Sequence, residues 1–107
     1  MPARVMVFAE IQKGREAAFE SAYRTVTAAV TGTPGHIRDE LLRDPECPGH
    51  YILLSEWESA EAFRAWEDAP IHRELTTPMR PFWAGRVKRT IFDVVPLHDG
   101  VPTGLSA

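Results

Sequence analysis

Residues 4–11, RVMVFAEI, predict a strand with apolar side chains on both of its faces. Successive side chains of a strand point to opposite sides, so the odd-numbered residues share one face while Met6 and Phe8 share the other. A strand with water on one side alternates apolar and polar residues instead. Residues 50–57, HYILLSEW, repeat the two-sided apolar pattern. The sheet that contains these strands must therefore be covered on both faces.

Turn residues and apolar spacing divide the rest of the chain into elements. Strands are predicted over 36–43, HIRDELLR, and over 86–95, RVKRTIFDVV. The segments TGTPG and DPECPG are rich in turn residues and separate these elements from their neighbours. A helix is predicted from residue 14 to about residue 30, where apolar residues recur at helical spacing: Phe19, Ala22, Tyr23, Val26 and Val30.

A second helix is predicted to begin after Ser59, whose hydroxyl can accept a hydrogen bond from a free backbone N–H of the first turn. Pro70 interrupts this helix, and residues 71–75 are expected to restart a short helical turn. The segment that follows, up to Gly85, contains two further prolines and is predicted to be irregular.

The order of elements is β-α-β-β-α-β, the split βαβ or ferredoxin-like arrangement of an α+β domain. Its four-stranded antiparallel sheet is covered by helices on one face only. A second copy of the chain would cover the other apolar face, so a homodimer is expected. A length of 107 residues suits one domain. We predict that domain over 1–95 and a flexible, turn-rich tail over 96–107.

Charge and cysteine content exclude several classes of partner. The formal net charge is −3 at pH 7 and no basic stripe is present, so nucleic acid is not an expected partner. The apolar runs are too short for a membrane span, and the N-terminal MPARV lacks the apolar stretch of a signal peptide. Cys47 is the only cysteine, so no internal disulfide and no cysteine zinc site are expected. These features favour the cytoplasm.

Short motifs follow one another in a set order: Pro34-Gly35, LLRD at 41–44, Pro48-Gly49, Glu56-Trp57, Ala62-Phe63, and Pro70 with His72. The last strand, ending FDVV, follows them. Together these motifs resemble the antibiotic biosynthesis monooxygenase superfamily, whose members are dimeric α+β barrels. The resemblance covers nearly the whole chain up to Val95.

The resemblance implies a homodimer with a barrel at its centre and a pocket between the helices and the sheet of each subunit. Members include small oxygenases that act on anthrones, quinols and other polycyclic aromatics, often without metal or cofactor. Others degrade haem, use flavin or isomerise signalling molecules, and the fold alone does not choose among them. We expect a monooxygenase for a polycyclic aromatic or quinol-type substrate, such as a polyketide intermediate, that uses O₂ and no cofactor or a diffusible reduced flavin.

His72 is the leading catalytic candidate, because the superfamily often has a histidine near the pocket mouth after such a proline. A neutral imidazole could remove a phenolic or benzylic proton, and the resulting carbanion or enolate can pass an electron to O₂ directly. The simpler interpretation is a histidine at a helix end on the surface. Flat rings would also stack on an aromatic substrate, although core packing explains a buried tryptophan equally well. The aromatic candidates for substrate binding are Trp66, Phe82, Trp83 and Phe63.

Asp39 is the second catalytic candidate. In a regular strand it shares a face with Ile37 and Leu41, so a carboxylate interrupts an apolar row where relatives tend to be aromatic or apolar. A buried carboxylate is costly unless it is paired, and it could act as a base or hold a substrate hydroxyl. We prefer a salt bridge to a nearby arginine, for example Arg89 of the last strand, because structural ion pairs are common.

Haem binding and degradation is a second hypothesis, because Trp66 matches the helix tryptophan of that branch. Two departures oppose it. That branch has an asparagine in the first strand where this chain has Val7, and its ligating histidine would lie near Thr76, later than His72. A third hypothesis is an isomerase, a cyclase or a non-catalytic small-molecule binding dimer. The four histidines lie on different elements without helical i, i+4 spacing, so no metal site is expected.

Overall fold

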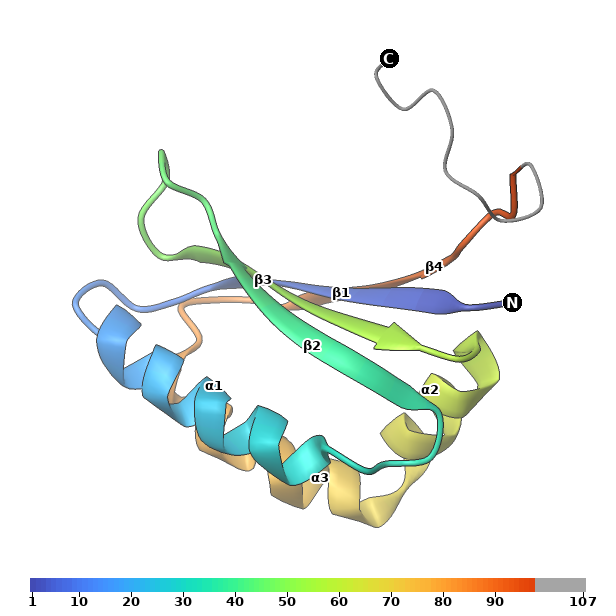
Figure 1. The fold of residues 1–107 in the computed structure, drawn as a ribbon. Helices are drawn as coiled ribbons and strands as arrows, with labels where there is room; N and C mark the ends of the chain where they lie inside the picture. Colours follow the sequence, from blue (N-terminus) through green and yellow to red (C-terminus); the bar gives the residue numbers. More distant parts are fainter. Residues whose placement is uncertain (98–107) are drawn as a thin grey trace.

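The computed structural model describes residues 1–97 (Figure 1). The tail predicted over 96–107 lies, from residue 98 onward, outside the described residues. The β-α-β-β-α-β order is confirmed, with the second helical region divided by Pro70. The elements are β1 (Ala3–Glu10), α1 (Glu16–Val30), β2 (His36–Arg43), β3 (His50–Trp57), α2 (Ala60–Asp68), α3 (Pro70–Thr76), the 3₁₀ helix η1 (Thr77–Phe82) and β4 (Lys88–Asp93).

The four strands form one sheet in the order β2-β3-β1-β4, and every neighbouring pair is antiparallel. Figure 1 shows the helices in a single layer below this sheet. The predicted ferredoxin-like α+β fold is therefore confirmed. Among residues 1–97, no helix has both the length and the apolar character that a bilayer span requires.

Local chemistry explains where the helices begin and end. Ser59 caps α2, because its Oγ accepts a hydrogen bond from the backbone N of Ala62 at 3.1 Å. Helix α2 ends at Asp68, and Pro70 occupies the first turn of α3, where the missing N–H costs no helical hydrogen bond. The predicted cap and the predicted break are both confirmed.

The structure corrects several details of the predicted secondary structure. Strand β4 covers 88–93 rather than 86–95, because its ladder with β1 ends at the Phe8–Lys88 pair. The segment before β4 is not wholly irregular, since η1 forms a 3₁₀ helix in spite of its prolines. Strand β1 itself ends at Glu10, and Ile11 continues as an isolated bridge to Trp83. This bridge fixes the end of η1 against the sheet.

The core fills the space between the helix layer and the sheet. Phe19 of α1, Val5 of β1 and Trp57 of β3 are its largest fully buried side chains. The opposite face of the sheet carries apolar side chains too, since Phe8 and Phe92 are 38% and 47% exposed. No described element covers that face, and so both faces of the sheet are apolar, as the sequence pattern predicted.

Candidate functional site

A cavity of about 250 Å³ lies between the helices and the sheet, in the place that the sequence resemblance implied. All four strands and all the helices contribute to its wall. Its aliphatic wall includes Val5, Val7, Val26, Val30, Leu53 and Met79. Its aromatic wall is formed by Tyr23, Trp57, Phe63, Trp66, His72 and Trp83. A cavity of this size and lining suits a flat, mostly apolar molecule.

His72 enters the cavity from α3, directly after the break at Pro70. Its ring stands edge-on to the indole of Trp66, with 4.4 Å between the ring centroids. Burial lowers the pKa of His72 below its ordinary value of 6.5, while the charge of Glu67 opposes this shift and that of Arg80 adds to it. The imidazole is therefore neutral at pH 7 and has a free lone pair, as a general base requires.

Trp66 carries a polar atom that its surroundings leave unsatisfied. Its indole Nε1 is buried and has no hydrogen-bond partner among residues 1–97. An unpaired buried donor costs about 1–3 kcal/mol, and native proteins hold few of them. Trp66 lines the cavity with its ring beside His72, whereas its N–H is buried away from the open space of the cavity.

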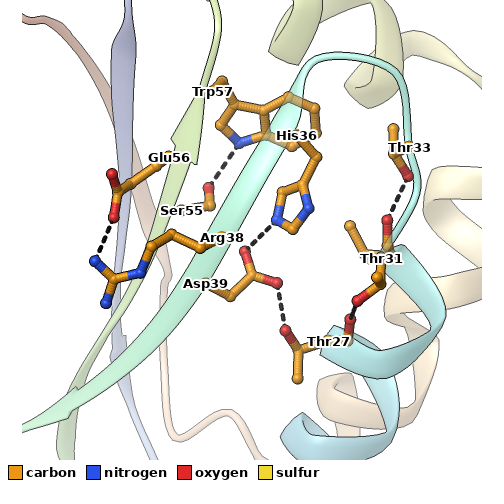
Figure 2. A network of polar contacts seen from close by, with 10 residues as sticks. Thr27, Thr31, Thr33, His36, Arg38, Asp39, Ser55, Glu56 and Trp57 are labelled. Atoms are coloured by element: carbon orange, nitrogen blue, oxygen red, sulfur yellow. Dashed lines mark hydrogen bonds and ion pairs between the residues drawn. The ribbon is translucent and has the colours of Figure 1, made fainter.

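Asp39 also lines the cavity, but its partners differ from the predicted arginine. One carboxylate oxygen lies 2.7 Å from Nε2 of His36, and the other accepts a hydrogen bond from the hydroxyl of Thr27 (Figure 2). Arg89 instead pairs with Glu67 of α2 at 2.7 and 2.9 Å. The preferred salt bridge between Asp39 and Arg89 was therefore wrong.

A β-bulge explains how His36 and Asp39 meet. Residues three apart in a regular strand point to opposite faces. The register of β2 shifts between His36 and Arg38, so that both His36 and Asp39 face the helix layer. The same shift leaves Ile37 52% exposed, which overturns the prediction that it shares an apolar face with Asp39. The sequence HIRDE contains no residue pattern that indicates this bulge. His36 was therefore not predicted as a site residue.

Three of the four aromatic candidates line the cavity: Phe63, Trp66 and Trp83. Phe82 does not line it. The ring of Phe82 packs 6.5 Å from that of Phe19, and the guanidinium of Arg15 lies over it at 4.8 Å. Tyr23, which the sequence assigned only to the core, is a lining residue that adds a phenol to the wall near Asp39.

Comparison with known proteins identifies the family. The sequence profile of the antibiotic biosynthesis monooxygenase family matches residues 2–77. This chain belongs to the antibiotic biosynthesis monooxygenase family. A solved structure with the same fold is SnoaB, a cofactor-independent oxygenase from Streptomyces nogalater, with a TM-score of 0.72. It is 24% identical, and the match covers 91% of this chain and 95% of that one.

Two curated proteins are similar in sequence to this chain. Protein SchA from Streptomyces halstedii is 37% identical over 82 residues, which are 77% of this chain and 22% of SchA. A heme oxygenase (mycobilin-producing) from Mycobacterium tuberculosis is 33% identical over 61 residues, 57% of this chain and 58% of that protein. The chain therefore spans only about a fifth of SchA and little more than half of the heme oxygenase.

The polar groups of the cavity provide acid–base chemistry. Residues 1–97 contain no group of three or more histidine, cysteine or acidic side chains placed to hold a metal ion. The wall offers a neutral imidazole at His72 and a paired carboxylate at Asp39. The charged side chains of Glu67, Arg80 and Arg89 line it as well. Such groups can remove a proton and stabilise the anion that remains.

Proposed function

We propose that this chain is an oxygenase that converts a fused-ring aromatic phenol or quinol with O₂ and without a metal. The observation that carries the proposal is the neutral imidazole of His72 in an aromatic-lined cavity, where it stands edge-on to the ring of Trp66. Membership of the antibiotic biosynthesis monooxygenase family supports it, as does the likeness to a cofactor-independent oxygenase. A polyketide intermediate belongs to this substrate class.

The imidazole of His72 begins the reaction as a general base. It takes a phenolic or benzylic proton from the bound ring system and becomes an imidazolium. The carbanion or enolate left behind passes one electron to O₂, and the resulting radical and superoxide combine at carbon. The imidazolium returns its proton to the peroxide, and loss of water leaves a carbonyl. For a methylene flanked by aromatic rings, one O₂ is consumed and one quinone carbonyl and one water are formed.

In this scheme the indole of Trp66 turns its buried N–H toward the bound substrate and stabilises the anionic intermediate. Proton removal places negative charge on the carbonyl or phenolic oxygen of the substrate. A donor directed at such a charge in a dry site stabilises it, which is the principle of an oxyanion hole. The same hydrogen bond would satisfy an indole N–H that otherwise has no partner among residues 1–97.

We further propose that the chain acts as a homodimer through the uncovered face of the sheet. Phe8 of β1, Leu42 of β2 and Phe92 of β4 all leave more than a third of their surface exposed, at 38%, 37% and 47%. They alternate with residues that face the helices, and no described element lies over them. Exposed apolar area of this kind favours burial against a second copy.

Oxygen uptake tests the proposed function. Metal-free protein is incubated in air with an anthrone, and O₂ consumption is followed together with formation of the anthraquinone. We expect uptake above the uncatalysed rate, a large loss of rate in His72→Ala, and little change in His50→Ala, whose imidazole is half-exposed beside Glu10. Absence of uptake with anthrones and dihydroquinones alike would refute the proposal. An isomerase, a cyclase or a binding protein would then remain.

Haem degradation is a second candidate, supported by the heme oxygenase relative and by the contact between Trp66 and His72. His72 would be the residue that holds haem iron. Two features of the wall fit poorly. Val7 lines the cavity and offers no hydrogen bond, and about 250 Å³ is small for a macrocycle. A haem titration decides: a Soret shift that is lost in His72→Ala would favour haem. Added reduced flavin in the oxygen assay tests the flavin alternative.

A further inference from the structure

Asp39 is held by two donors from different elements. His36 of β2 lies 2.7 Å from one carboxylate oxygen, and Thr27 of α1 donates to the other. Both partners are visible in Figure 2, where the carboxyl group of Asp39 lies between the imidazole and the threonine hydroxyl. Two donors on two oxygens fix the plane of a carboxylate and prevent it from rotating.

His36 is held as firmly as the carboxylate. Its side chain is 6% exposed, and its ring stands edge-on to Trp57 with 5.0 Å between centroids. His36 does not line the cavity, whereas Asp39 and Thr27 do. The imidazole therefore lies behind the carboxylate and can reach a ligand only through Asp39.

The carboxylate of Asp39 has acceptor capacity left over. Two carboxylate oxygens offer about four lone-pair positions, and His36 and Thr27 use one on each oxygen. The side chain of Asp39 is 14% exposed, and it lines a cavity whose wall is mostly apolar. The neighbouring phenol of Tyr23 and hydroxyl of Ser55 also line the cavity and make this part of the wall polar.

We propose that Asp39 binds a hydroxyl group of the aromatic substrate, and that His36 is the positioning residue that holds its carboxylate for that hydrogen bond. This inference rests on the proposed function and adds a second contact point, on β2, to the one at His72 on α3. The ligand class becomes a fused aromatic with a free phenolic hydroxyl. Such a donor forms a charge-assisted hydrogen bond with the carboxylate, which is stronger than a neutral one.

A different role for these residues would be purely structural. The Thr27–Asp39 hydrogen bond joins α1 to β2, and its loss would lower stability without changing which ligand is preferred. The two roles differ in one quantity, the ratio of affinities for a ligand with a hydroxyl and for a ligand of the same shape without it.

The test compares binding of 2-hydroxyanthraquinone and 2-methylanthraquinone, measured by quenching of tryptophan fluorescence. Neither compound contains the reduced ring that O₂ attacks, so binding is measured apart from turnover. We expect wild-type protein to prefer the hydroxyl compound by about tenfold or more, the usual effect of a hydrogen bond to a charged group. Asp39→Asn should remove most of this preference, and Asp68→Asn, an exposed carboxylate of α2, should retain it.

Variants of His36 test the positioning role. His36→Phe keeps an aromatic ring against Trp57 but removes the donor, and it should lower the hydroxyl preference severalfold. His36→Gln places an amide donor near the position of Nε2 and should restore much of it. Thermal unfolding of each variant identifies those that fail to fold, and Thr27→Val provides a second way to release the carboxylate.

An unchanged preference in folded Asp39→Asn would overturn the inference, as would failure of wild-type protein to bind either compound. These outcomes are distinct from failure of the proposed function. If hydroxyl preference depends on Asp39 but anthrones take up no O₂, the oxygenase proposal fails alone. If anthrones are oxidised and Asp39→Asn keeps the preference, only this inference fails.

Discussion

At the scale of single residues, the chemistry of the cavity depends on how burial changes proton affinity. His72 was predicted as a site residue from its place after Pro70, and it does line the cavity. Asp39 was predicted from its unusual position in an apolar row, and it lines the cavity as well. Their partners could not be predicted, because the contacts of Asp39 with Thr27 and His36 depend on tertiary packing and on a bulge.

The lowered pKa of His72 predicts how activity depends on pH. Only the neutral imidazole accepts a proton, so kcat/KM should rise with pH through an apparent pKa below 6.5 and then level off. The unfolded chain binds this proton more readily than the folded chain, so stability should also fall as pH drops below 6.5. Both effects should disappear in His72→Ala. A wild-type rate profile that is flat across this range would contradict the assignment.

The tyrosines give a second prediction at this scale. Burial is the main cause that raises the pKa of both Tyr23 and Tyr51 to about 12, from an ordinary value of 10.0. The negative charge of Asp39 adds to the shift of Tyr23, and a hydrogen bond to Glu20 adds to that of Tyr51. The chain has only 2 tyrosines, so folded protein should show no tyrosinate absorbance near pH 10. Tyrosinate absorbance that appears near pH 10 in the folded protein would contradict this burial.

At the scale of elements, turn and cap residues made most boundaries predictable. Strands β2 and β3 begin and end where the sequence predicted, because glycine, proline and aspartate mark the turns beside them. Strand β4 was predicted too long, since its end depends on where the ladder with β1 stops. The bulge in β2 was missed for a related reason: the backbone irregularity has no residue signature.

Gly35 gives a prediction for the turn that leads into β2. Its φ is +82°, and a Cβ built there would lie 2.5 Å from Cβ of Ala62 in α2. Gly14 has a similar φ of +83° but nothing within 4 Å, so Gly14→Ala measures backbone strain alone, about 1–2 kcal/mol. Gly35→Ala should lower the free energy of unfolding in urea clearly more than Gly14→Ala does, because α2 must move away from the turn.

The double variant Gly35→Ala with Ala62→Gly separates the two contributions. Removing Cβ of Ala62 relieves the overlap, so the double variant should be more stable than the sum of the single changes predicts. If the losses of unfolding free energy in the two single variants add up to the loss in the double variant, the close approach of the turn to α2 is unimportant.

At the scale of the whole molecule, the helices form one layer and leave the other face of the sheet uncovered by any described element (Figure 1). The two-sided apolar pattern of β1 predicts this apolar face. The pattern could not show what covers it. We propose a second copy, which would turn two open sheets into a shared barrel and bury Phe8 and Phe92.

The oligomeric state tests this proposal. Analytical ultracentrifugation of wild-type protein should give a dimer, and Phe92→Lys should give a folded monomer, because a buried unpaired charge is costly at an apolar interface. Ile71→Lys is the matched control, since Ile71 is 45% exposed but belongs to α3 in the helix layer. A wild-type monomer, or equal dissociation by both variants, would refute the proposed interface.

Transfer of oxygen from heavy-isotope O₂ tests most directly whether His72 makes this cavity an oxygenase site. Metal-free wild-type protein should convert an anthrone to an anthraquinone whose new carbonyl oxygen comes from O₂. His50→Ala should do the same at a similar rate, and His72→Ala should fall close to the uncatalysed rate. Incorporation that is equally fast in His72→Ala, or that never exceeds the protein-free reaction, would contradict this role of His72.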